Sequence, residues 1–171
     1  NLYRMTKSFQ DGMPDAIKTP IQKSTSKELV YKGSESRYAL GTAGNKDVGR
    51  SGTLQYLHCS EIAFWENTEE LETGLFQCVG DVDGTEIFLE STANGMGNFF
   101  HQKSIAALQG KGDYRLCFIP WFWQDEYESG IAGKSKLTDA EIEYMTLYML
   151  EDEKIKYLSE EKIVSKILWR R

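Results

Sequence analysis

Two largely apolar stretches of the chain each end abruptly in polar side chains. Glu86–Glu90 runs into the small hydroxyl and amide residues of Ser91–Gly95, and Tyr56–Cys59 runs into Ser60 and Glu61. Apolar runs of this length, bounded by small polar residues, are typical of strands in a buried sheet. In open α/β sheets, ligands bind at the carboxyl ends of the strands, where side chains leave the sheet. The pattern therefore predicts two strands whose polar ends share one site.

Helix-length segments separate these strands from each other and from a third. A helix is predicted to begin near Asn67 and another to run from about Asn98 to Leu108. A further strand is predicted over Tyr114–Ile119, where Pro120 stops it. Strands separated by helices imply right-handed crossovers and a mainly parallel sheet. The predicted fold class is therefore α/β, with a mainly parallel sheet flanked by helices.

The chain before these strands carries a different pattern. Glu28–Lys32 and Ser36–Leu40 flank Gly33 and Ser34, which predicts a β-hairpin. The first 25 residues show no sustained period, so we expect loop and short helix there.

After Gly133 the pattern becomes helical. Residues 138–141 fit a capping box, because the Thr138 hydroxyl can accept a hydrogen bond from the Glu141 amide while the Glu141 carboxylate reaches back. A second capped helix is predicted to begin at Ser159. The apolar residues that share a face of the first helix are Ile142, Met145 and Met149.

Charge and cysteine content narrow the classes of function. The chain has 171 residues, enough for one domain with a buried core, and its net charge of −6 argues against a surface that binds polyanions over its whole extent. Its cysteines, odd in number and irregularly spaced, favour neither a disulfide framework nor a zinc site: Cys59, Cys78 and Cys117. No signal-like segment or membrane-length apolar run occurs. We therefore expect a protein of the reducing cytoplasm.

With these residues in view, the chain resembles the ATPase domain of the large terminase subunit, the DNA-packaging motor of tailed bacteriophages. In that family an arginine precedes an apolar strand that ends in a glutamate, the Walker B element, and a Ser/Thr-Ala-Asn coupling motif follows the next strand. The corresponding residues here are Arg50, Leu57–Glu61 and Ser91–Gly95. The ranges that resemble the family are 49–102, which is the most specific, 118–122 and 168–171.

The resemblance implies a partial P-loop NTPase domain of the ASCE type. Residues 1–135 would be the C-terminal portion of the ATPase core, and 136–171 a helical segment leading toward a nuclease domain. The chain contains no Gly-x-x-x-x-Gly-Lys-Ser/Thr phosphate loop, and it starts without methionine. We therefore expect a piece of a longer polypeptide that lacks the Walker A segment and the nuclease domain and is inactive alone.

The resemblance also implies an activity and its partners. The full motor would hydrolyse ATP with Mg²⁺ to push double-stranded viral DNA into a procapsid, in the cytoplasm of an infected or lysogenic bacterial host. Its partners would be double-stranded DNA, neighbouring copies in a homo-oligomeric ring, the portal protein and the small terminase subunit, with no membrane involved.

The residue types suit the implied roles. ATP hydrolysis needs a carboxylate that orients or deprotonates the attacking water, and Glu61 would be that catalytic residue. Arg50 would act as an arginine finger toward a neighbouring subunit's ATP, because its planar charged guanidinium suits phosphoryl oxygens. Ser60 stands where many P-loop ATPases carry aspartate, so its contact with the metal would run through water. The ATP-sensing and coupling segment would consist of Ser91, Thr92, Ala93 and Asn94, in which Asn94 senses the γ-phosphate and the two hydroxyl residues support it.

Other interpretations of the same residues stay open. Glu61 and Glu90 both stand at strand ends and are candidates for the paired carboxylates of a metal-dependent hydrolase of phosphodiesters or glycosides. The C-terminal helices are candidates for a noncatalytic interaction module. From residue type alone, Glu61 could start a loop, Asn94 and Gly95 could form a turn, and Arg50 could be a surface residue of a glycine-rich connector.

Overall fold

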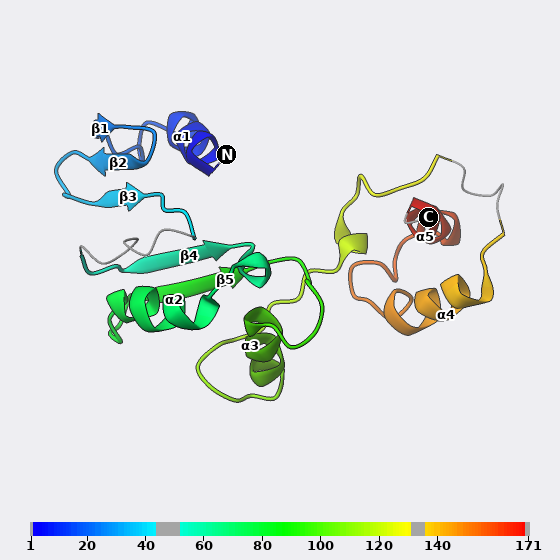
Figure 1. The fold of residues 1–171 in the computed structure, drawn as a ribbon. Helices are drawn as coiled ribbons and strands as arrows, with labels where there is room; N and C mark the ends of the chain where they lie inside the picture. Colours follow the sequence, from blue (N-terminus) through cyan, green and yellow to red (C-terminus); the bar gives the residue numbers. More distant parts are fainter. Residues whose placement is uncertain (1, 44–51, 131–135, 170–171) are drawn as a thin grey trace. The chain divides into compact units, whose positions relative to one another are not determined.

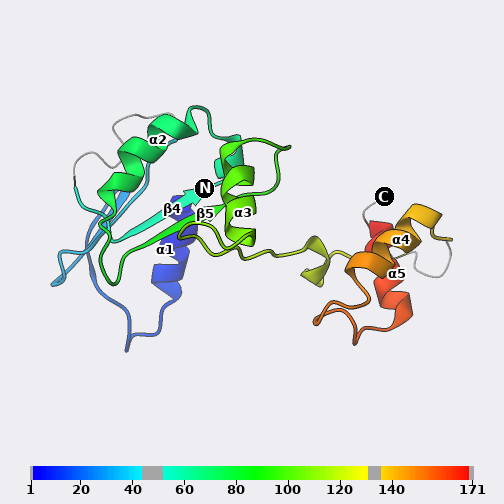
Figure 2. The ribbon, with the colours of Figure 1, turned by 90° about the horizontal axis from the view of Figure 1, so that it is seen from below.

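The computed structural model describes residues 2–43, 52–130 and 136–169 of the chain (Figure 1, and from below in Figure 2). These residues belong to two units, Asn1–Arg115 and Leu116–Arg171. The first unit holds both strands of the predicted site, and the second holds the helices predicted over 136–171. Arg50 lies outside the described residues.

The first unit begins with a helix and a small antiparallel sheet. The elements are α1 (Leu2–Gly12), β1 (Ile21–Ser24), β2 (Glu28–Tyr31) and β3 (Arg37–Ala39), with the strands side by side in that order. Strands β2 and β3 pair with Leu29 opposite Tyr38, and Gly33 takes a φ of 86° in the turn between them. Glycine adopts such a backbone without steric cost. The predicted hairpin is confirmed, and the short helix expected near the start of the chain is α1.

Strands β4 (Tyr56–Ser60) and β5 (Glu86–Glu90) form a two-stranded parallel sheet. Leu57 and Cys59 of β4 form a core with Ile62 and Leu75, against which Ile87 and Leu89 of β5 pack. The elements between the strands are η1 (Ile62–Phe64), α2 (Thr68–Leu75) and η2 (Phe76–Cys78). The fold is therefore mixed α/β with a small parallel sheet, and this part of the prediction is confirmed.

Helix α3 (Phe99–Leu108) follows β5 after a loop and begins where predicted (Figure 1). Asn98 caps it, because the Asn98 Oδ1 accepts a hydrogen bond from the His101 amide at 2.9 Å. Phe99 and Phe100 pack against the core of the parallel sheet. The loop that leaves β5 is therefore held at both ends, by the strand and by a capped helix.

The second unit consists of helices around its own core. Its elements are η3 (Trp121–Trp123), α4 (Asp139–Tyr148) and α5 (Glu160–Trp169). The capping box is confirmed, because Thr138 Oγ1 accepts from the Glu141 amide at 3.4 Å and the Thr138 amide donates to Glu141 Oε2 at 2.7 Å. The expected cap of α5 is also present, with Ser159 Oγ accepting from the Lys162 amide at 3.3 Å. The core residues are Phe122, Met149, Ile155, Ile163 and Ile167.

Two expectations differ from the structure. Tyr114–Ile119 forms no strand. Neither sheet among the described residues includes this segment, and Phe118 is 74% exposed. Aromatic and β-branched residues favour a strand only where a neighbouring strand and packing complete it. On the predicted face of α4, Met149 is buried, whereas Ile142 is 45% exposed.

The described residues contain no helix with the length and apolarity needed to span a bilayer.

Candidate functional site

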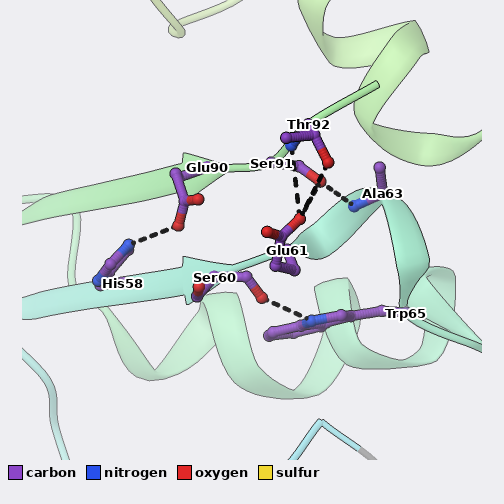
Figure 3. Close-up of polar contacts among 8 residues, drawn as sticks. All are labelled: His58, Ser60, Glu61, Ala63, Trp65, Glu90, Ser91 and Thr92. Atoms are coloured by element: carbon purple, nitrogen blue, oxygen red, sulfur yellow. Dashed lines mark hydrogen bonds and ion pairs between the residues drawn. The ribbon is translucent and has the colours of Figure 1, made fainter. Parts of the chain in front are cut away.

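The two polar strand ends meet because β4 and β5 pair in parallel. Ser60 stands opposite Glu90 in the register, so Glu61 and Ser91 each leave the sheet at the same edge. Figure 3 shows Glu61, Ser91 and Thr92 gathered at this edge. The prediction that the two strand ends lie together is confirmed by this geometry.

Glu61 leaves β4 with an unusual backbone. Its φ of 55° and ψ of 38° lie in the left-handed region, and η1 begins at the next residue. Non-glycine residues seldom adopt this conformation, which costs about 1–3 kcal/mol and persists only where surrounding contacts fix it. The turn directs the Glu61 side chain toward the end of β5 (Figure 3). The contacts that fix it come from β5 and the loop after it.

One oxygen of the Glu61 carboxylate receives three donors from the end of β5. Glu61 Oε2 accepts hydrogen bonds from Ser91 Oγ at 3.3 Å, from the Thr92 amide at 3.4 Å and from Thr92 Oγ1 at 3.4 Å. The Oε1 atom receives no hydrogen bond from the described part of the chain, and Glu61 is exposed. The carboxylate is thus oriented through one oxygen, and the other has no hydrogen bond within the described residues. Ser91 and Thr92, expected to support Asn94, contact Glu61 directly.

The backbone of Ala63 is held by two side chains of the coupling segment. The Ala63 amide donates to Ser91 Oγ at 3.2 Å, and Asn94 Nδ2 donates to the Ala63 carbonyl at 3.0 Å. Ala63 is 7% exposed, so these bonds satisfy polar groups that water reaches poorly. Ser91 therefore contacts both Glu61 and Ala63, and the coupling segment is hydrogen-bonded to the turn that follows β4.

Asn94 is in turn held by the cap of the next helix. The Asn98 Nδ2 donates to the Asn94 carbonyl at 2.7 Å, while the Asn98 Oδ1 caps α3. Ala93 lies between Thr92 and Asn94 and is exposed. Sequence reasoning assigned no role to Ala63 or Asn98. A signal existed for Asn98, since asparagine before a helical pattern is an N-cap signature.

Ser60 contacts the turn that follows β4 through its backbone carbonyl. Its carbonyl accepts a hydrogen bond from Trp65 Nε1 at 2.9 Å, which closes the turn from the other side (Figure 3). The Ser60 hydroxyl has no hydrogen bond within the described residues, so the predicted water-mediated metal contact of this hydroxyl stays a prediction. Trp65 is a further residue that sequence reasoning did not assign to the site.

Glu90, the other strand-end carboxylate, has a different partner. His58 Nε2 lies 3.3 Å from Glu90 Oε2, and both side chains are 54% exposed. The pair spans β4 and β5 on the sheet face, whereas Glu61 points to the sheet edge (Figure 3). Within the described ranges, no group of three or more His, Cys, Asp or Glu side chains could hold a metal ion.

Cys59 lies directly before these residues on the buried side of β4. Burial raises the pKa of its thiol to about 11. The thiol is therefore neutral at physiological pH and acts as a small apolar core residue rather than as a nucleophile.

Comparison with known proteins identifies no family for this chain. No protein-family model matches the chain, and no curated protein matches it in sequence. A functional assignment must therefore rest on the geometry of the strand ends and on the motifs that the chain carries.

Proposed function

We propose that the chain is the part of a terminase-type ATPase, of the ASCE class of P-loop NTPases, that carries the catalytic glutamate and the coupling segment. The observation that supports this most is the oriented carboxylate of Glu61 at the end of β4, bonded through Oε2 to Ser91 and Thr92 at the end of β5. The two motifs that the resemblance identified lie 30 residues apart in the chain and are in contact in the structure.

The geometry suits general-base chemistry. A carboxylate that orients water must be held rigidly while it keeps one oxygen available to that water. The three donors orient Oε2, whereas Oε1 of this exposed residue has no hydrogen bond within the described residues. Glu61 would take the proton of the attacking water, and Arg50 of a neighbouring subunit would neutralise charge on the phosphoryl oxygens. Bound Mg²⁺ would neutralise charge at the phosphates. An upstream phosphate loop would hold the ATP.

Within a longer polypeptide that contains the phosphate loop, this site would drive packaging of double-stranded DNA. The motor would be a homo-oligomeric ring acting with a portal protein and a small terminase subunit. Each of these partners follows from the proposed family and is part of the proposal.

Paired substitutions of the two strand-end carboxylates test the proposal. In the longer polypeptide, Glu61→Gln should still bind ATP but lose roughly two to four orders of magnitude in turnover, because the amide cannot accept the proton. Glu90→Gln is the matched control, since Glu90 pairs with His58 and not with the coupling segment. Its ATPase turnover should stay within about twofold of the parent.

The outcomes separate the proposal from its competitors. Near-normal turnover in Glu61→Gln shows that this residue is not the catalytic carboxylate. Equal losses in both variants, together with metal-dependent hydrolysis of phosphodiesters or glycosides, favour the paired-carboxylate hydrolase. A polypeptide that hydrolyses nothing yet binds a protein partner through α4 and α5 would support the noncatalytic module.

A further inference from the structure

Positive charge is concentrated in the part of the chain that precedes β4. Residues 1–50 contain nine Lys or Arg and five Asp or Glu, whereas residues 51–171 contain eleven Lys or Arg and twenty-one Asp or Glu. An acidic chain with one basic segment is expected to attract polyanions at that segment alone. The antiparallel sheet β1–β2–β3 is the main element of this segment.

Strand pairing decides which side chains share a face of this sheet. Lys23 of β1 and Arg37 of β3 both stand opposite Val30 of β2, so all three point to one face. Glu28, two residues before Val30, shares that face. We call it the outer face, because Leu29 points to the other side and is fully buried there.

The outer face carries more cations than carboxylates. Lys23 Nζ lies 3.2 Å from Glu28 Oε2, and Arg37 Nε lies 3.3 Å from Glu28 Oε1. The Lys23 and Arg37 side chains are 61% and 66% exposed, whereas Glu28 is 22% exposed. One carboxylate therefore holds two exposed cations in place along the sheet and neutralises only half of their charge.

Two further lysines flank the central strand. Lys27 precedes β2 and Lys32 follows it, and both are exposed. Neither has an ion pair within the described residues. Glu35, in the turn between β2 and β3, is the other carboxylate of this hairpin. Four cations thus stand against two carboxylates over three short strands.

The composition of the outer face favours a duplex backbone over a single strand. Proteins that bind single strands stack bases on aromatic side chains. Tyr31 and Tyr38 lie on the same face as Leu29, because Tyr31 is two residues from it and Tyr38 is its partner in the register. Among the paired strand residues, the outer face carries lysine and arginine and no aromatic ring. Lysine and arginine side chains contact phosphates and position a protein on duplex DNA.

We propose that the cationic surface of the β1–β2–β3 sheet binds the phosphate backbone of double-stranded DNA. This surface is formed by Lys23 and Arg37 on the outer face and by Lys27 and Lys32, which flank β2. The choice of duplex DNA rests on the proposed function, whereas the location of the surface rests on strand register and charge. It would give the motor a DNA contact that is separate from the carboxylate at Glu61.

Salt dependence of binding tests the proposal. Binding of the 171-residue chain to a fluorescein-labelled duplex would be followed by anisotropy between 50 and 200 mM salt. Four phosphate contacts predict a slope of about −3.6 in log K against log salt, which is a loss of about a hundredfold over this range. The variant K23Q/K27Q/K32Q/R37Q should bind at least tenfold more weakly at 50 mM salt and lose most of that slope.

Two further variants keep the test decisive. The control K111Q/K136Q/K154Q/K156Q removes the same charge from the remainder of the chain and should retain the slope. The variant K27Q/K32Q touches no ion pair of the sheet, so it should fold normally and reduce the slope by about two. Circular dichroism would check that each variant is folded.

Several results would overturn the proposal. These are an unchanged slope in K27Q/K32Q, an equal loss in the control, no duplex binding at 50 mM salt, stronger binding to single strands than to duplex, or binding to phosphatidylserine vesicles but not to DNA. DNA binding is measured in the absence of ATP, so it does not depend on hydrolysis. If the variants bind DNA with unchanged affinity and salt slope while hydrolysis still depends on Glu61, this inference fails and the proposed function stands.

Discussion

The Ser91 hydroxyl should stabilise the first unit, because it satisfies a buried backbone group. Replacing Ser91 by alanine leaves the Ala63 amide, in a residue only 7% exposed, without its acceptor. The same substitution removes one of the three donors to Glu61 Oε2. Both effects act on the turn that follows β4.

The magnitude follows from the two lost contacts. A buried amide left without a partner costs about 1–3 kcal/mol. The bond to Glu61 is exposed and long, at 3.3 Å, so it contributes little. We expect Ser91→Ala to lower the free energy of unfolding by about 1–2 kcal/mol. With a urea dependence of about 2 kcal/mol per molar, this lowers the unfolding midpoint by about 0.5–1 M.

Ser60→Ala is the matched control, because it makes the same chemical change at the neighbouring strand end, where the hydroxyl has no hydrogen bond within the described residues. It should stay within about 0.5 kcal/mol of the parent chain. Hydrogen exchange gives a local measurement, in which the Ala63 amide should exchange about tenfold faster in Ser91→Ala for each 1.4 kcal/mol lost. If both variants unfold at the same urea concentration and Ala63 exchanges equally in both, Ser91 does not hold this turn.

Three further predictions concern other residues. In the longer polypeptide, Asn94→Ala should retain part of the hydrolysis but lose DNA translocation, and equal losses of both would count against a coupling role. Arg50→Ala should bind ATP yet lose roughly three to five orders of magnitude in turnover. Mixing it with Glu61→Gln should restore partial activity at the one interface with an intact composite site, and mixed rings that form without activity would exclude action in trans. Burial raises the pKa of Cys59 from 9.0 to about 11, so between about pH 9 and pH 11 the unfolded thiol ionises first. Stability in urea should then fall with rising pH, and a Cys59→Val variant should show a flatter profile.

The strand ends were predictable because two independent patterns agree there. Apolar runs of strand length stop at small polar residues, and the helix-length segments between them require parallel strands. Parallel pairing then brings both carboxyl ends to one edge, which is where Glu61 meets Ser91 and Thr92. Helix starts at Thr138 and Ser159 were predictable for a similar reason, since a cap is a local side-chain contact.

Features that depend on backbone geometry or on distant partners were not predictable. The left-handed conformation of Glu61 has no signature in residue type, because glutamate rarely adopts it. Ala63 contributes only backbone groups, so no side-chain pattern marks it. The strand predicted at Tyr114–Ile119 has the right composition, but strand formation requires a neighbour that the sequence of the segment itself does not reveal.

The hydrogen bonds around Glu61 form a continuous connection from the carboxylate to helix α3. Ser91 contacts Glu61 and the Ala63 amide, Asn94 holds the Ala63 carbonyl, and Asn98 joins Asn94 to the start of the helix. The links differ in strength. The bonds to Glu61 are 3.3–3.4 Å long and exposed, whereas Asn98 donates to the Asn94 carbonyl at 2.7 Å and accepts from the His101 amide at 2.9 Å. If Glu61 turned to a bound water, as the proposed function requires, the Ser91 hydroxyl would lose its acceptor but would still accept the hydrogen bond from the Ala63 amide. A change at the carboxylate would therefore act first on the end of β5, and it would reach α3 only if Asn94 also releases Ala63, which is why Asn94→Ala should separate hydrolysis from movement.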